Sequence, residues 1–136
     1  MTDCVFCKII AGEIPSCKVY EDEQAIAILD ITQVTPGHTL LIPKRHYRNL
    51  LEMDAASTAE LFSLTPSLAT KILSATGASG LNIVNNNEEP AGQTVFHTHI
   101  HFLPRYQEGD DFDITFTAHE PDFEKMASLA EKIAKS

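Results

Sequence analysis

Three histidines at every second position constrain this chain more than any other feature of its sequence. They are His97, His99 and His101, within the segment 92–105. Side chains of a β-strand alternate between its two faces, so this spacing predicts a strand with three imidazoles on one face and apolar side chains on the other. Successive rings would stand ~6.6 Å apart, close enough for all three to surround one small anion or metal. The strand should end at Pro104, which cannot donate to a sheet ladder.

Length and charge narrow the class of protein. The chain has 136 residues, 43% of them hydrophobic, which suits a single domain with a core. We expect one domain over 1–136, with a C-terminal helical tail from about 106 to 136. The formal charge of −9 disfavours a surface for nucleic acid polymers or anionic membranes, because both require a basic patch. A small phosphate ligand stays possible.

The lack of a recognisable targeting signal and the cysteine content predict a cytoplasmic protein. No stretch approaches the ~20 apolar residues of a membrane span, and the first residues, Met1 to Cys4, lack the pattern of a signal peptide. The chain has three cysteines, and this odd number favours free thiols or metal ligands over a disulfide framework.

Apolar periodicity predicts a mixture of strands and helices. Four segments before the histidines are expected to be extended: 18–21, 24–30, 38–43 and 81–85. Helical spacing runs from Asp54 to Gly77, where Pro66 should kink the helix or begin its second half. A second main helix should follow Pro121.

The pair Cys4 and Cys7 has the C-x-x-C spacing, for which three interpretations stay open. The pair could supply half of a tetrahedral zinc site, and the other two ligands would then have to be histidines. It could also be two buried thiols, or a redox dithiol, although redox motifs follow a strand and three residues precede this pair. Cys17 has no partner at useful spacing and should be a small packing residue.

The histidine segment also allows three interpretations. An ordinary half-exposed strand is the least favoured, because three histidines in register on an apolar strand are hard to obtain by chance. A metal site is the second, since His-x-His pairs chelate zinc or iron. The third is phosphoryl transfer without a metal at the reacting centre, in which a neutral imidazole attacks phosphorus.

The residues around the histidines resemble the signature of the histidine triad (HIT) family. The resemblance is carried by the segment 91–103 and by segments 9–15, 29–31, 37–40 and 42–46. It is greatest to the Hint-like branch, including bacterial members that carry zinc. The galactose-1-phosphate uridylyltransferase branch has glutamine where this chain has His101, so the third histidine favours hydrolysis over transfer between sugars.

The resemblance implies a nucleotide hydrolase. It would cleave a nucleoside 5′-monophosphate, most plausibly AMP, from a phosphoramidate, an ester or an anhydride of the dinucleoside polyphosphate type. His99 would be the nucleophile and would form a covalent nucleotidyl-histidine. His101 and His38 would line the phosphate site, and Thr94 would act at the bridging atom of the leaving group. No metal would be needed at the reacting centre.

The family also implies residues that bind the substrate, a purine nucleotide. Gln93 and Thr94 would supply a backbone N–H and a hydroxyl to the phosphate, and Asn86 would contact the same region. Asp30 would accept hydrogen bonds from both ribose hydroxyls, although a cap at a strand end is the alternative role for it. The walls of the base pocket would be apolar: Phe6, Ile9, Ile14, Ile28, Leu29 and Ile31.

The implied architecture is an α+β HIT-like domain with a five-stranded antiparallel sheet and two main helices. Two copies would pair into a homodimer with a ten-stranded sheet. A structural zinc would be held by Cys4, Cys7, His46 and His97. Two rival functions stay open: a zinc-stabilised nucleotide-binding adaptor with little turnover, and a mononuclear metallohydrolase that uses the three triad histidines as ligands.

This chain departs from the Hint pattern in two places. Ala91 precedes Gly92 where two glycines are usual, and Thr94 replaces a serine but keeps the hydroxyl. The tail from Tyr106 is longer than in short Hint proteins. Because the C-terminus of this family helps to shape the leaving-group pocket, the tail bears on which leaving group is preferred.

Overall fold

The central strands of the sheet are buried almost throughout, so both faces of the sheet are covered there. The computed structural model describes residues 3–107 and 109–136, so the prediction about Met1 to Cys4 falls partly outside the described residues. The sheet is five-stranded and antiparallel, with the order β1-β2-β3-β5-β4. Its strands are β1 (Lys18–Glu21), β2 (Ala25–Leu29), β3 (Thr39–Pro43), β4 (Gly80–Val84) and β5 (Ile100–Arg105). The predicted α+β fold and antiparallel sheet are confirmed.

The helices are shorter and more numerous than the sequence suggests. They are α1 (Val5–Ile10), α2 (Ala55–Ser63), α3 (Thr65–Thr76) and α4 (Phe123–Ala134), with 3-10 turns at Leu50–Glu52 and Glu89–Ala91. The predicted helix from Asp54 to Gly77 is α2 followed by α3. Pro66 lies in the first turn of α3, where its missing N–H costs no helical bond. It therefore begins the second helix instead of kinking one long helix.

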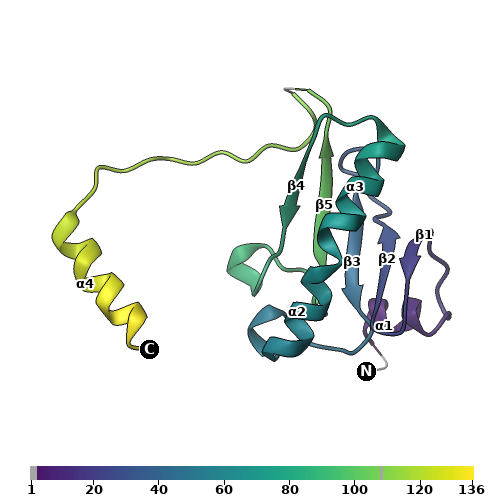
Figure 1. The fold of residues 1–136 in the computed structure, drawn as a ribbon, viewed down its shortest axis with the longest axis horizontal. Coiled ribbons are helices and arrows are strands. Elements are labelled where there is room, and N and C mark those ends of the chain that lie inside the picture. Colours follow the sequence, from purple (N-terminus) through teal and green to yellow (C-terminus); the bar gives the residue numbers. More distant parts are fainter. Residues whose placement is uncertain (1–2, 108) are drawn as a thin grey trace.

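Register places two kinds of side chain on opposite faces of the sheet. Ala27, Leu41 and Ile100 pair across β2, β3 and β5, and they pack with apolar residues of α2 and α3. These two helices cross one face of the sheet (Figure 1). The adjacent pairs Ile28–Leu40 and Leu40–His101 lie one residue away on each strand and occupy the other face. The predicted alternation in β5 is thus confirmed for His101 and its apolar neighbours.

The histidine strand is shorter at its start and longer at its end than predicted. His97 and His99 precede β5, because the chain before Ile100 leaves the ladder and the backbone N–H of Thr98 donates to the Tyr47 carbonyl at 2.8 Å. Pro104 lies within β5. Beyond the last β3 pair its carbonyl accepts from the Thr35 hydroxyl at 2.7 Å, so the missing N–H of proline breaks no ladder bond.

The C-terminal tail leaves the rest of the chain. After residue 112 every side chain up to Ser136 is exposed, and α4 lies apart from the sheet, beyond the β4 edge (Figure 1). Asp122 caps α4 by accepting from the Lys125 N–H at 3.1 Å. Within 3–107 and 109–136, no helix combines the length and the apolar character that a membrane crossing needs.

A tight packing contact fixes the loop before β3. Gly37 has a φ of +93°, and a Cβ built on it would stand 2.7 Å from Thr76 Cγ2 and 3.2 Å from Pro104 Cγ. The absence of a side chain here lets the loop that carries His38 press against α3 and β5.

We predict that Gly37→Ala lowers the free energy of unfolding by about 2–5 kcal/mol, because the left-handed φ costs ~1–2 kcal/mol and overpacking adds ~1–3 kcal/mol. Gly109→Ala is the matched control, since Gly109 has a φ of +91° but nothing within 4 Å of a built Cβ. Denaturant unfolding of both variants measures the difference. Equal losses in the two variants would show that the contact with Thr76 does not limit this loop.

Candidate active site and metal centre

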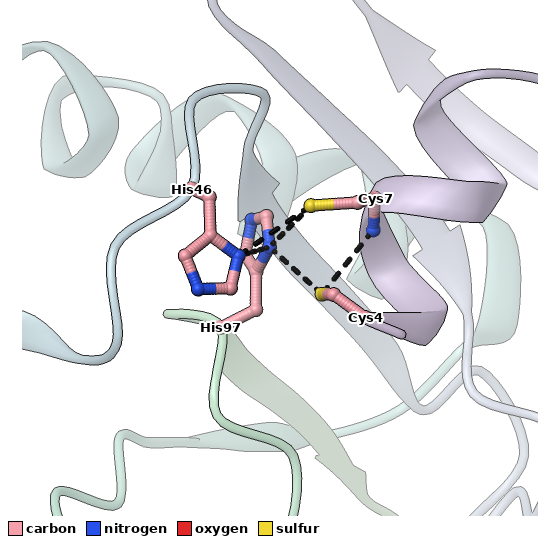
Figure 2. A group of neighbouring side chains, drawn as sticks. All are labelled: Cys4, Cys7, His46 and His97. Carbon is pink, nitrogen blue, oxygen red and sulfur yellow. Dashed lines mark hydrogen bonds between the residues drawn. The ribbon is translucent and has the colours of Figure 1, made fainter. Parts of the chain in front are cut away.

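Four side chains from three segments converge beside the face of the sheet that carries His101, which we call the site face. Cys4 and Cys7 flank the first turn of α1, His46 follows β3 and His97 precedes β5 (Figure 2). The ligand atoms of all four lie within 4.8 Å of one another. Two cysteines and two histidines that are far apart in the sequence therefore form one group that could hold a metal ion.

The spacing of these atoms fits four-fold coordination. His97 Nδ1 lies 3.3 Å from Cys4 Sγ, 3.6 Å from Cys7 Sγ and 3.1 Å from His46 Nδ1, and Cys7 Sγ lies 3.4 Å from His46 Nδ1. A tetrahedron with metal–ligand bonds of ~2.0–2.3 Å has edges of ~3.3–3.8 Å. The backbone N–H of Cys7 also points at Cys4 Sγ, at 3.4 Å, which favours a thiolate there.

The other ring nitrogen of His97 is also engaged. Nε2 donates to the Pro43 carbonyl at 2.8 Å, and the side chain is fully buried. This bond fixes the tautomer in which Nδ1 is free to act as a ligand. Both ring nitrogens of His97 face these partners, so the structure does not place His97, His99 and His101 around one ion or anion, an arrangement that the strand spacing allowed.

His99 is oriented by a bond to the backbone. Its Nδ1 lies 2.7 Å from the His97 carbonyl, which can only accept, so Nδ1 carries the proton and Nε2 presents a lone pair. The ring of Phe6 packs edge-on against it, with centroids 5.0 Å apart.

A relay of hydrogen bonds orients His101 in the opposite sense. The backbone N–H of Val34 donates to His38 Nδ1 at 3.3 Å, so the proton of His38 lies on Nε2. His38 Nε2 is 2.9 Å from His101 Nδ1 and donates to it, which leaves the proton of His101 on Nε2. The rings of His99 and His101 lie 5.0 Å apart. His99 Nε2 therefore offers a lone pair, and His101 Nε2 beside it offers an N–H.

Burial keeps these imidazoles neutral. Burial lowers the pKa of His38 and of His99, and it lowers the pKa of His101 to about 4, helped by repulsion from His99 and His38. The carboxylate of Asp30 opposes the shift in each ring. All three are neutral at pH 7, as a nucleophile and a neutral donor require.

Asp30 follows β2 at the edge of this group. Its Oδ1 accepts from the backbone N–H of Thr32 at 2.7 Å and from the Thr32 hydroxyl at 2.5 Å, while Oδ2 lies 3.8 Å from His38 Nε2. Burial opposes its ionisation, but the bonds from Thr32 and the nearby histidines hold the pKa of Asp30 below its usual range. Asp30, His38 and His101 form a second group whose ligand atoms lie within 4.8 Å.

Apolar residues cover the same face of the sheet. Phe6 and Ile28 are buried in one cluster with Leu40, and Ile9 packs against it. Three further predicted wall residues lie outside this cluster. Ile14 and Leu29 are half-buried, and Ile31 is 99% exposed. The structure therefore brings together Phe6, Ile9 and Ile28 and leaves Ile31 at the surface.

Gln93 is part of the scaffold in this structure. Its amide donates to the carbonyls of Arg48 and Val95, and its Oε1 accepts from Asn49 and from the backbone of Glu88. Its own backbone N–H, expected to meet phosphate, donates to the Glu88 carbonyl at 3.2 Å. Two other predicted contacts stay accessible, since Thr94 is exposed and Asn86 is half-buried.

Sequence reasoning missed the groups that hold this loop. Glu88 has a φ of +75° and accepts two bonds of 2.8 Å from the guanidinium of Arg48. Asn85 holds the other side of the site, because its Nδ2 donates to the His99 carbonyl at 3.0 Å. No spacing in the sequence signals either contact, since the partners are brought together by the sheet.

The chain is similar to proteins of a known family. The model of the HIT domain family matches residues 11–108. The match includes His38, His46 and the three triad histidines, whereas Cys4, Cys7 and residues 109–136 lie outside it.

Individual relatives match most of the chain. Protein hit of Bacillus subtilis is 48% identical over 135 residues, 98% of this chain and 93% of that protein. Adenylylsulfatase HINT3 of Arabidopsis thaliana is 48% identical over 103 residues, 76% of this chain but 52% of that protein, so the match spans about half of it. The crystal structure of SMU.412c from Streptococcus mutans UA159 superposes with a TM-score of 0.96 at 59% identity, over 99% of this chain and 85% of that chain.

We predict that the contribution of Glu88 to stability depends on pH. Bonds from Arg48 and Asn49 lower the pKa of Glu88 from 4.5 to about 2. A depressed carboxyl pKa stabilises the fold above the unfolded value and loses this effect as pH falls through the folded value. The melting temperature of the parent should therefore exceed that of Glu88→Gln at pH 6, and the gap should narrow towards pH 3. The exposed neighbour variant Glu89→Gln is the control, and a gap that is constant with pH would contradict the assignment.

Proposed function

The chain belongs to the HIT domain family, and on this premise we propose that it hydrolyses nucleotides through a covalent nucleotidyl-histidine. The released product would be a nucleoside 5′-monophosphate, and the substrate a phosphoramidate, an ester or a dinucleoside polyphosphate anhydride. The observation that carries the proposal is the pair of opposite tautomers at His99 and His101. A relative named as an adenylylsulfatase supports a hydrolase that acts on an adenylyl compound.

The first step would be displacement at the α-phosphorus. His99 Nε2 attacks, a P–N bond forms, and the bond to the leaving group breaks with its electron pair staying on the leaving atom. The ring becomes positively charged, and its Nδ1–H bond to the His97 carbonyl stabilises that charge. Thr94 lies in the segment just before the triad histidines, and its hydroxyl would donate to the leaving atom, as the family resemblance implies.

The second step would return the enzyme to its starting state. Water attacks the phosphorus, the P–N bond breaks, and the nucleoside 5′-monophosphate leaves while His99 recovers its lone pair. During both steps His101 Nε2–H would donate to a non-bridging phosphate oxygen, held in that tautomer by His38. No step requires a metal at phosphorus.

The substrate would lie on the site face of the sheet. Asp30 keeps an ionised carboxylate beside His38 and would accept from the ribose hydroxyls after exchanging its bonds from Thr32. The apolar cluster around Phe6 and Ile28 would receive a purine base. Asn86 would contact the phosphate region from the loop after β4.

We further propose that the four-residue group holds zinc. Two thiolates and two imidazoles at tetrahedral spacing are the donor set that zinc prefers. Four protein ligands leave no open position for water, so the ion would tie α1 to the segments of His46 and His97 and act on stability. This arrangement also needs reduced thiols, in keeping with a cytoplasmic location.

A homodimer is the proposed assembly. β4 is an edge strand of the described sheet, and Ile83 on it is 47% exposed. Pairing of two β4 edges would continue the ladder into a ten-stranded sheet and remove an exposed edge.

We predict that His99→Ala lowers turnover by several orders of magnitude, because it removes the covalent nucleophile. Single-turnover assays on adenosine phosphoramidates and dinucleoside polyphosphates measure the rate, and acid-free mass spectrometry of quenched samples locates the adduct. His119→Ala, a change to an exposed tail histidine, is the control and should keep the parental rate. Near-normal turnover by His99→Ala would refute the mechanism.

The same assays separate the rival functions. A parent protein that binds the nucleotides without releasing monophosphate would be an adaptor. A folded parent that loses hydrolysis after chelation, with His99 intact, would be a metallohydrolase, for which Asp30, His38 and His101 offer a ligand set.

We predict that Cys4→Ala abolishes about one bound zinc per chain and lowers the melting temperature. An ion that binds the folded state alone adds about 4 kcal/mol when free zinc exceeds Kd a thousandfold. Cys17→Ala is the matched control, since Cys17 is exposed and outside the four-residue group. Elemental analysis and thermal unfolding of both variants make the test, and Cys4→Ala protein with full zinc content would exclude this ligand set.

A further inference from the structure

His99 lies just before the paired part of β5. This strand runs between β3 and β4 (Figure 1). Towards its N-terminal end, β5 pairs with β4 as far as His101, opposite Val84, and with β3 as far as Ile100, opposite Leu41. The ladder therefore stops one residue short of His99, and the backbone there needs partners of another kind to stay in one position.

Two such partners hold this backbone from opposite sides. The backbone N–H of Thr98 donates to the Tyr47 carbonyl at 2.8 Å, and the Thr98 hydroxyl donates to the same carbonyl at 3.3 Å. The carbonyl of His99 accepts from Asn85 Nδ2 at 3.0 Å. Tyr47 follows β3 and Asn85 follows β4. Each of the two strands beside β5 is thus continued by a residue that holds the segment before it.

A second asparagine fixes the orientation of the Asn85 amide. The backbone N–H of Leu50 donates to Asn87 Oδ1 at 2.8 Å, so Nδ2 of Asn87 faces Asn85 and donates to its Oδ1 at 2.8 Å. Nδ2 of Asn85 is then the atom that meets the His99 carbonyl. This amide relay begins at a group that can only donate and ends at a group that can only accept, so both ends require the same orientation of the two amides.

The position of the His99 backbone decides where its ring nitrogen Nε2 points. The ring is tied through Nδ1 to the His97 carbonyl at 2.7 Å, which fixes it relative to the local backbone. Asn85 and Tyr47 fix that backbone relative to the sheet. Because a displacement of ~1 Å at a reacting group can cost ~10²-fold in rate, both levels of support bear on nucleophilic attack.

We propose that Asn85 is a positioning residue for the attack by His99 and that Asn87 keeps its amide in the required orientation. The proposal rests on the proposed function, since it assigns Asn85 a part in the step that forms the nucleotidyl-histidine. Asn85 acts through the His99 backbone, whereas Asn86, which makes none of the three relay bonds, is the residue expected to contact phosphate. Loss of Asn85 should therefore slow the covalent step and leave nucleotide affinity nearly unchanged.

Asn85→Ala tests this separation of rate from affinity. Its single-turnover rate of adduct formation should fall about 10–100-fold, because the nucleophile is no longer held in its aim. Its Kd for AMP should stay within about twofold of the parental value, because no substrate contact is removed. Asn82→Ala is the matched control: Asn82 is a half-buried asparagine of β4 whose Oδ1 accepts from Arg105 at 2.8 Å. This control should keep the parental rate even where it lowers the melting temperature.

Asn87→Asp tests the orientation of the relay. An aspartate keeps the shape of the side chain and still accepts from the Leu50 N–H, but it presents an acceptor to Asn85 in place of a donor. The Asn85 amide should then turn over, which directs its Oδ1 at the His99 carbonyl and breaks that bond. We expect Asn87→Asp to slow adduct formation as much as Asn85→Ala does, and the double variant to be no slower than either. Losses that multiply in the double variant would overturn the relay.

The ring of His99 gives a readout that needs no turnover. Two-bond ¹H–¹⁵N correlation spectra distinguish its Nδ1–H tautomer from its Nε2–H tautomer. The parent and Asn82→Ala should show the Nδ1–H form alone, whereas Asn85→Ala should show a mixture, because a loosened backbone weakens the bond to the His97 carbonyl.

The outcomes separate this proposal from the function on which it rests. A parental rate of adduct formation in Asn85→Ala would overturn the positioning role, and so would a loss that appears only as weaker AMP binding. A parent that forms no adduct would refute the proposed function. In that case the spectra decide alone, and an unchanged His99 signal in Asn85→Ala would overturn the positioning role as well.

Discussion

The double engagement of His97 is the constraint on which the rest of the site depends. Nδ1 faces the two cysteines and His46, and Nε2 donates to the Pro43 carbonyl. The carbonyl of the same residue accepts from His99 Nδ1. One buried residue therefore joins α1, the segment after β3 and His99, so the order of the four-residue group and the orientation of His99 are coupled.

Hydrogen bonds from neighbouring groups fix which ring nitrogen carries the proton in His99 and in His101. The Val34 N–H, through His38, decides which nitrogen of His101 carries hydrogen, and the His97 carbonyl decides this for His99. Burial lowers the pKa of each ring, so none of them needs to lose a proton before it acts. Such preorganised donors and acceptors cost no reorganisation during reaction, which is the physical basis of the proposed hydrolysis.

The two faces of the sheet differ in what they carry: one holds most of the core and the other holds residues of the candidate site. One face is covered by α2 and α3 and supplies most of the core. The other carries His101 beside a smaller cluster that includes Phe6, and Asp30, His38 and His99 lie directly at the ends of buried strands. The tail and the β4 edge of the described sheet lie outside both cores, and both carry exposed apolar side chains.

Local patterns in the sequence were enough to predict the sheet, the family and the candidate residues, because strand alternation, C-x-x-C spacing and the triad signature do not depend on distant partners. Tertiary structure alone decided that His97 turns away from the other two histidines, that Gln93 is enclosed by Arg48 and Glu88, and that Pro104 continues β5. Each of these outcomes depends on a partner distant in the sequence, and periodicity carries no information about which backbone carbonyl or loop will lie opposite a given side chain.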